Sequence, residues 1–233
     1  DTLAGRFAVA GYEVVLDVAR ADLCVLNSCA VTRSAEIKST RRLRALRRAN
    51  PAARLVLTGC FANRVALDQA GFEQADVDLV VPNPHKDALV ARVQLAAAGE
   101  GGRALPLADP LASCRQALRP RTRPLVKVQD GCDNACAYCI VHRLRGPQRS
   151  RSRDEIVAEV LSLRDVGCHE VVLTGVHVGA YGRERGESLT GLLRHLLAAL
   201  DSPDPNPAFR LRVSSIEPWD LAPDFFALWQ DPR

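Results

Sequence analysis

The chain has 233 residues, of which 47% are apolar and 25% are charged, and this composition is typical of a folded globular protein. Its first residues lack the apolar core of a signal peptide, and no apolar run reaches the roughly 18 residues that a membrane helix needs. We therefore expect a cytoplasmic protein without membrane contact. Met is absent even at position 1, which suggests a piece of a longer polypeptide.

The net charge of +4 is unevenly distributed along the chain. Between Arg115 and Arg153 there are ten Lys or Arg and only two Asp, so the remainder is net negative. A concentrated basic region suggests a polyanionic partner, with RNA as the leading candidate. A solvated surface that balances an anionic cofactor is the alternative.

Strands and helices alternate through residues 1–98. Apolar runs predict buried strands, and capping residues such as Thr32 predict helix starts. We expect strands at 12–16, 22–27, 55–58 and 78–81, and helices at 3–10, 32–48, 61–70 and 85–97. This alternation predicts an α/β domain with a doubly wound parallel sheet.

Two cysteines in this region each follow a predicted strand directly. Because the carboxyl ends of parallel strands meet at one edge of the sheet, Cys29 and Cys60 should lie together in the ligand-binding crevice. We interpret them as ligands of a metal cluster, with buried thiols of no special role as the alternative. Cys24 falls in mid-strand and is expected in the core.

Residues 99–123 are rich in Gly, Pro, Ala and Arg and are expected to form an interdomain linker. Beyond it, residues 124–233 contain three strand–helix units. The strands are expected at 124–128, 170–174 and 210–213, and the helices at 154–166, 189–200 and 221–229. Repeated units of this kind predict a (β/α) barrel, but only part of one, so we expect the chain to be truncated at this end too.

Three cysteines with the spacing C-x3-C-x2-C follow the first strand of this second region. Cys132, Cys136 and Cys139 place three thiols on one short loop, which is typical of a metal site. A cubic iron–sulfur cluster held by three thiolates keeps one iron open. A zinc site needs a fourth ligand, which His142 could supply as a Cys3His set.

The stretch Gly131–Cys139, followed by Arg145-Gly146 and Ser150-Arg151, resembles the core of the radical S-adenosylmethionine (SAM) methylthiotransferase family. The resemblance implies a radical SAM barrel in which a [4Fe–4S] cluster on the three cysteines binds SAM at its open iron. It also implies an electron donor as a partner. The chemistry would belong to the cofactor, and the protein would position it.

The amino-terminal domain carries its own part of the resemblance. Residues 27–32 and 58–62 are similar to the second and third cysteine motifs of the family's amino-terminal domain. This implies an auxiliary [4Fe–4S] cluster, held in part by Cys29 and Cys60, that delivers the sulfur. The family's first cysteine motif has no counterpart here, so we expect it to lie upstream and to have been lost by truncation, together with the first strand.

Two further loops should surround the three-cysteine loop. Gly175 allows a close backbone approach to a ligand, while Ser215 and Glu217 offer groups for the ribose or amino group of SAM. His177 faces the same site, either as a base or as a structural histidine with satisfied hydrogen bonds. The remaining cofactor-binding residues that we expect are Tyr138 and Arg145. Ordinary turns between strand and helix are the alternative, and no catalytic residue is assigned beyond the clusters.

Residues 173–182 and 213–218 resemble the branch that acts on N6-threonylcarbamoyladenosine in tRNA. This implies insertion of a methylthio group at C2 of adenosine 37, with the tRNA anticodon loop as partner. Separately, we expect the enzyme to be a monomer. The alternatives are isopentenyladenosine 37, a ribosomal-protein side chain, or a non-catalytic zinc-stabilised RNA-binding module. The fragment alone, without its first auxiliary ligand, is expected to be inactive.

Overall fold

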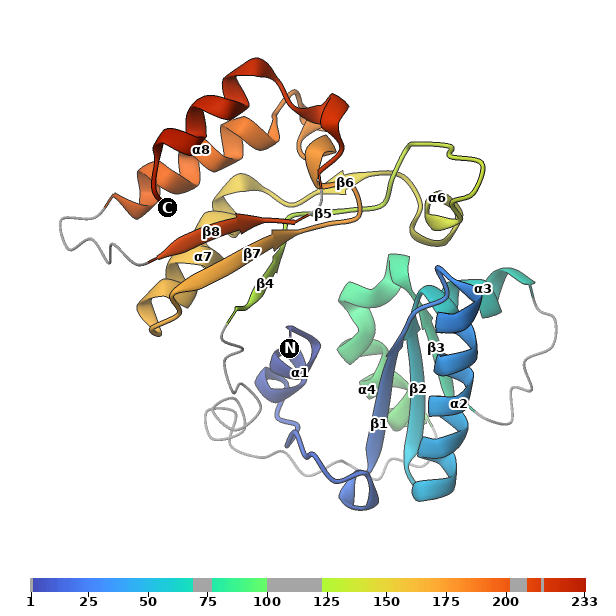
Figure 1. Ribbon diagram of the computed structural model, residues 1–233. Coiled ribbons are helices and arrows are strands. Elements are labelled where there is room, and N and C mark those ends of the chain that lie inside the picture. Colours follow the sequence, from blue (N-terminus) through green and yellow to red (C-terminus); the bar gives the residue numbers. More distant parts are fainter. Residues whose placement is uncertain (1, 69–76, 100–122, 202–208, 215) are drawn as a thin grey trace. The chain divides into compact units, whose positions relative to one another are not determined.

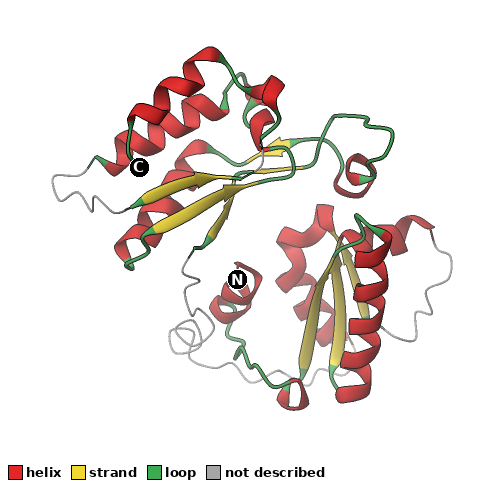
Figure 2. Cartoon of the chain, viewed as in Figure 1, coloured by secondary structure: helices red, strands yellow, loops and turns green. Residues whose placement is uncertain are grey.

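The computed structural model describes residues 2–68, 77–99, 123–201, 209–214 and 216–233 (Figures 1 and 2). The chain divides into two compact units. One consists of Asp1–Arg119 with Tyr138–Arg145, and the other of Pro120–Ala137 with Gly146–Arg233. Almost all of the expected linker, 99–123, lies outside the described residues.

The first unit contains a three-stranded parallel sheet in the order β1-β2-β3. Its strands are β1 (Leu23–Ser28), β2 (Arg54–Gly59) and β3 (Leu79–Pro82). In the described part of residues 1–99 the strands are accompanied by the α-helices α1 (Thr2–Val9), α2 (Arg33–Ala49), α3 (Cys60–Asp68) and α4 (Leu89–Gly99). Short 3-10 segments lie at η1 (Val18–Arg20) and η3 (Asn83–Ala88).

Helices cover both faces of this sheet, because successive side chains of a buried strand point to opposite sides. Leu57 of β2 packs in one cluster with Leu43 of α2. Its neighbour Val56 packs in another cluster with Phe7 of α1 and Val93 of α4. The three described strands lie side by side in the same order as in the chain. They therefore contain no point at which the strand order reverses.

The predicted strand at 12–16 is wrong. The segment pairs with none of the described strands, since the sheet ends at β1. Its Leu16 is fully exposed, and Tyr12 instead packs edge-on against Phe7 of α1 with ring centroids 5.2 Å apart. A short apolar run without a strand beside it has no hydrogen-bond ladder to join.

The second unit contains a parallel sheet in the order β4-β7-β8. The strands are β4 (Leu125–Lys127), β7 (Glu170–Thr174) and β8 (Arg210–Val213). The described residues of this unit form the helices α7 (Arg153–Asp165) and α8 (Leu189–Leu200) between them. The core is formed by residues such as Val126, Leu173 and Leu196, which are at most 1% exposed. None of the helices in the described ranges is long and apolar enough to cross a membrane.

Two features of this unit were not expected. A two-stranded antiparallel ribbon joins β5 (Gln129–Asp130) to β6 (Arg149–Ser150). The predicted helix at 221–229 is a 3-10 helix, η7 (Pro223–Gln230), preceded by another, η6 (Pro218–Asp220). Two further 3-10 turns follow β7, η4 (Val178–Ala180) and η5 (Arg183–Arg185).

Asp78, directly before β3, should give the first unit an acid-sensitive contact. Burial alone would raise the pKa of its carboxyl, but the backbone N–H of Leu55 and the guanidinium of Arg47 lower it below the ordinary value. A carboxylate with a lowered pKa stabilises the fold above its ordinary pKa of about 4 and loses this effect as the pH falls through the lowered value.

Replacing Asp78 with Asn should therefore flatten the fall of the melting temperature between about pH 5 and pH 2. Thermal unfolding at a series of pH values measures this slope. The exposed carboxylate of Asp87 pairs with Arg6 and provides a matched control in Asp87→Asn. Equal slopes in the two variants would show that Asp78 contributes no more to the acid sensitivity of the melting temperature than an exposed carboxylate does.

Candidate functional site

The three-cysteine loop begins at a turn that requires glycine. Gly131 has φ +72°, and a Cβ there would collide with the carbonyl group of Pro147. The next residue, Cys132, donates its backbone N–H to the carbonyl of Gly146 at 3.2 Å. The two arms of the β5–β6 ribbon therefore hold the first cysteine close to the segment that follows the loop.

Gln129 of β5 is buried to 1% exposure and connects this turn to the loop after β7. Its side-chain oxygen accepts the backbone N–H groups of Val176, at 3.1 Å, and His177, at 2.8 Å. Its side-chain nitrogen donates to the carbonyl groups of Asp130, at 3.1 Å, and Gly131, at 2.8 Å. All four hydrogen-bonding positions of the amide are thus used.

Replacing Gln129 with Leu should lower the free energy of unfolding by about 3 kcal/mol, because two buried N–H groups would lose their acceptor. Urea unfolding followed by circular dichroism measures the change. Gln230 is exposed, so Gln230→Leu is the matched control and should stay within about 0.5 kcal/mol of the wild type. A similar small effect at both positions would contradict the role given to Gln129.

His177 lies at the centre of a second set of contacts. Its Nε2 is 2.6 Å from Oδ2 of Asp220, whose other carboxylate oxygen is 2.5 Å from Nη2 of Arg183. Its Nδ1 faces Sγ of Cys132 at 3.8 Å and Nδ2 of Asn134 at 3.5 Å. The sequence left two interpretations of His177 open, a base or a structural histidine with its hydrogen bonds satisfied. In this arrangement both ring nitrogens have polar neighbours.

The second strand of the ribbon, β6, is held by Glu184. Its carboxylate accepts the backbone N–H of Ser150 at 2.6 Å and the side-chain amide of Gln148 at 3.0 Å. Burial alone would raise the pKa of Glu184, but these hydrogen bonds outweigh it and hold the pKa below its ordinary value. The backbone N–H of Gln148 in turn donates to Asp133 within the cysteine loop, at 2.9 Å.

The end of the cysteine loop belongs to the first unit. There α6 (Val141–Arg145) packs Leu144 into the cluster that contains Phe61 and Ala62 of α3. The buried side chain of Asn63 donates to the carbonyl of Leu144 at 2.5 Å and accepts the N–H of Asn83 at 2.5 Å. The helix that follows Cys139 is therefore fixed to the first unit by both apolar packing and a buried amide.

The three thiols are free, with Cys136 exposed and Cys132 and Cys139 half-buried. Within the described ranges, no three Cys, His, Asp or Glu side chains are placed together as metal ligands. Three free thiols within eight residues are nevertheless the donor set of a [4Fe–4S] cluster with one open iron, and metal binding can itself order such a loop.

Cys29 and Cys60 follow adjacent parallel strands, since Ser28 of β1 is paired with Gly59 of β2. Their surroundings differ. Cys29 is exposed, whereas Cys60 begins α3, is 1% exposed and has the side-chain amide of Asn83 3.6 Å from its Sγ. The two residues thus share the expected sheet edge, and Cys24 lies in the core as expected.

The other expected cofactor residues are divided between the two units. Tyr138 is 92% exposed, and Arg145 ends α6. The backbone of Gly175 closely approaches Gln129. A Cβ at position 175 would lie only 3.0 Å from the carbonyl and side-chain oxygens of Gln129. Glu217 is exposed and accepts the N–H of Asp220 through its carbonyl at 3.0 Å, while Ser215 lies outside the described residues.

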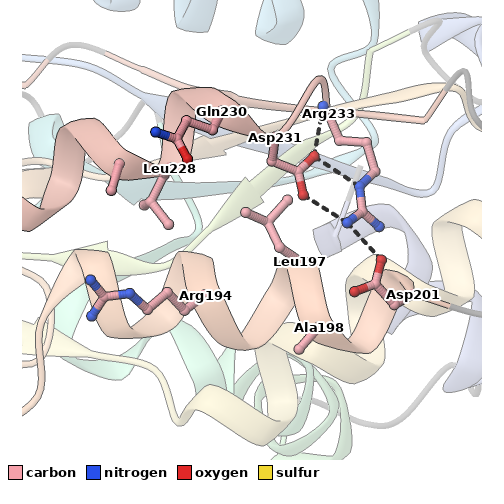
Figure 3. A pocket seen from close by; sticks show the side chains of 9 residues that line it. Arg194, Leu197, Ala198, Asp201, Leu228, Gln230, Asp231 and Arg233 are labelled. Atoms are coloured by element: carbon pink, nitrogen blue, oxygen red, sulfur yellow. Dashed lines mark hydrogen bonds and ion pairs between the residues drawn. The ribbon is translucent and has the colours of Figure 1, made fainter.

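A pocket at the carboxyl-terminal end of the second unit contains none of these residues (Figure 3). It lies between α8 and η7, and an ion-pair group of Arg233 with Asp231 and Asp201 occupies one side. The residues that line it are Arg194, Leu197, Ala198, Asp201, Ala227, Leu228, Gln230, Asp231 and Arg233. This pocket is therefore not the place where the expected cofactor-binding residues meet.

Two family models match the chain, the Radical SAM superfamily over residues 126–225 and the uncharacterized protein family UPF0004 over residues 1–82. The threonylcarbamoyladenosine tRNA methylthiotransferase MtaB of Chlamydia pneumoniae is 35% identical over 222 residues, which cover 94% of this chain and 48% of that protein. The chain belongs to the radical SAM methylthiotransferase family. It spans about half the length of the curated relatives it matches.

The relatives of this chain differ in the substrates for which they are named. The ribosomal protein uS12 methylthiotransferase RimO of Syntrophotalea carbinolica is also 35% identical, over 80% of this chain and 43% of that protein. Among solved structures, the radical SAM methyltransferase TsrM of Kitasatospora setae matches with a TM-score of 0.54 over 81% of this chain and 43% of TsrM. At 16% identity this second likeness concerns the fold alone.

Sequence reasoning missed the polar residues that support the loop of this methylthiotransferase-family chain, above all Gln129, Asn134 and Asp220. Gln129 did carry a signal, because it is a polar residue that directly follows the mostly apolar run 125–128 and lies two positions before Gly131. Asp220 carried none, since Pro218-Trp-Asp220 has the composition of an ordinary exposed turn.

Proposed function

We propose that the whole protein is a tRNA methylthiotransferase that inserts a methylthio group at C2 of N6-threonylcarbamoyladenosine 37 in the anticodon loop. The observation that carries the proposal is the C-x3-C-x2-C loop at the start of the segment that matches the Radical SAM superfamily. The substrate is supported by similarity to MtaB proteins, which are named for threonylcarbamoyladenosine tRNA.

In this proposal Cys132, Cys136 and Cys139 hold a [4Fe–4S] cluster whose fourth iron binds SAM. When bound, the cluster supplies the electron that cleaves SAM, drawn from an external donor. The chain's own contribution is to position the loop: Gly131 makes the turn, and Gln129 fixes it to the segment before His177. The candidates for contacts with SAM remain Gly175, Glu217, Tyr138, Arg145 and Ser215.

An auxiliary [4Fe–4S] cluster bound in part by Cys29 and Cys60 is the second part of the proposal. Support comes from their adjacent strand ends and from the amide of Asn83 at the Cys60 sulfur, a donor suited to a thiolate ligand. Ser39 of α2 holds the backbone of Cys29 through its hydroxyl, which donates to the Cys29 carbonyl at 2.9 Å. Sulfur delivery would take place at this edge of the first sheet.

Two architectural statements belong to the same proposal. The three strands β1-β2-β3 would be part of a larger doubly wound sheet over residues 1–98, and β4-β7-β8 part of a (β/α) barrel over residues 124–233, joined by a linker at 99–123. The three loops after β5, β7 and β8 would then lie on the face where barrels of this kind hold their active sites.

An RNA partner is supported by the charge of the chain. Several exposed cations have no ion pair within the described residues. On α2 they are Arg33, Lys38, Arg41, Arg42 and Arg48, and near the three-cysteine loop they are Arg149 and Arg153. Such residues could contact the phosphates that flank a base turned out of a loop.

Nucleoside mass spectrometry of tRNA from cells that lack and regain the full-length gene tests this function. The 2-methylthio form of threonylcarbamoyladenosine should disappear and return. If the 2-methylthio form of isopentenyladenosine were lost instead, or a modification on a ribosomal protein, the proposed substrate would be wrong. The substrate of the correspondingly named relatives would then take its place. Purified full-length protein that holds zinc and leaves SAM intact under strong reductant would overturn the enzymatic proposal.

A further inference from the structure

Asp220 is the most deeply enclosed charged side chain near the three-cysteine loop. Its side chain is 0% exposed, and each carboxylate oxygen has a partner, Nε2 of His177 at 2.6 Å and Nη2 of Arg183 at 2.5 Å. A carboxylate can only accept hydrogen bonds. The ring proton of His177 therefore lies on Nε2.

The opposite edge of the same ring faces the cysteine loop. In the neutral ring with its proton on Nε2, Nδ1 carries a lone pair. The amide nitrogen of Asn134 lies 3.5 Å from this atom and can donate to it, and Sγ of Cys132 lies 3.8 Å away. A single imidazole thus connects the turn after β8 with the first three residues of the cysteine loop.

The backbone around this connection is shaped to admit Asp220. A Cβ at Gly179 would collide with the Cβ and carboxylate of Asp220, so the 3-10 turn after His177 can approach it only as glycine. The side chain of His177 is itself 7% exposed, which leaves the ring little freedom to turn. Both the acceptor and the space for it are therefore built into the fold.

We propose that Asp220 is a positioning residue that sets the orientation and tautomer of His177, and through His177 the Cys132 end of the cysteine loop. Partners in a second layer around metal ligands commonly fix the ligand's orientation in this way. The tautomer is a property of the chain alone. The consequence for iron rests on the proposed function.

Nitrogen-15 NMR of the full 233-residue chain, without metal, tests the tautomer directly, with the His177 signals assigned by their loss in His177→Gln. The key variant is Asp220→Asn, which keeps the shape but can donate its amide to the ring and so allow the proton to move to Nδ1. The matched control is Asp224→Asn, which removes the carboxylate of an exposed ion pair with Arg194.

The wild type and Asp224→Asn should show the Nε2–H form, and Asp220→Asn should show a large shift toward the Nδ1–H form. After anaerobic reconstitution, the chelator concentration that removes half of the iron should change about tenfold in Asp220→Asn only, because the Nδ1–H form turns a donor instead of a lone pair toward Sγ of Cys132. An Nε2–H tautomer in all three proteins would overturn the inference. A tautomer change in a chain that takes up no iron–sulfur cluster would uphold the positioning by Asp220 and count against the proposed function.

A second variant keeps the inference testable if Asp220→Asn fails to fold. Asn134 is exposed, so Asn134→Ala removes its amide without touching the core. The Nδ1 resonance of His177 should then shift while the Nε2 resonance stays in place, because only Nδ1 loses a donor. A protonated Nδ1 in the wild type, or a shift at Nε2 alone, would contradict the arrangement.

Discussion

Replacing Cys136 with alanine should lower the iron held by the three-cysteine loop at least tenfold, since loss of a ligand should weaken binding no less than the roughly 10–100-fold cost of losing a second-layer partner. Cys136 is exposed, so the change should leave the fold intact. The measurement is iron content and visible absorbance after anaerobic reconstitution. It is best made in a Cys29→Ala background, which removes the contribution of an auxiliary cluster.

The control for this experiment is Cys168→Ala. Cys168 is also a free thiol of the second unit, but it is buried to 6% exposure and lies outside the loop. It should retain the iron of the parent protein. If Cys136→Ala retained its iron as well, the three-cysteine site would be wrong. A stoichiometric zinc content in the parent protein, lost in Cys136→Ala, would favour the Cys3His alternative with His142.

Replacing Gly131 with alanine should lower the free energy of unfolding of the second unit by about 2–5 kcal/mol. Two costs combine at this position. A left-handed backbone costs a residue with a Cβ about 1–2 kcal/mol, and the collision with the Pro147 carbonyl adds an overpacking cost of about 1–3 kcal/mol. Both tryptophans, Trp219 and Trp229, belong to the second unit, so fluorescence during urea unfolding reports on it.

Gly167 separates the two costs. It has φ +88° but open space where a Cβ would lie, so Gly167→Ala should cost only the backbone part, about 1–2 kcal/mol. The difference between the variants measures how tightly the β5–β6 ribbon closes on the cysteine loop. Equal losses at both positions would mean that the ribbon can open to admit the methyl group at no cost.

Local patterns were sufficient for most of the architecture. Apolar runs such as Leu55–Thr58 and Glu170–Thr174 predicted strands that the structure contains, because a strand buried on both faces has to be continuously apolar. The same reasoning failed at 12–16, where an apolar run has no strand beside it, and at 221–229, where the segment forms 3-10 turns. It also missed the β5–β6 ribbon, whose two arms are only two residues each.

Cysteine spacing and the alternation of strands and helices are properties of neighbouring residues, so the amino-acid sequence alone was enough to predict an α/β protein with three thiols on one loop and Cys29 and Cys60 at adjacent strand ends. The support of that loop is of another kind. Gln129 reaches His177 across 48 positions, and His177 reaches Asp220 across 43. Such contacts form only when parallel strands bring their loops together, and no local pattern encodes which buried polar groups will meet there.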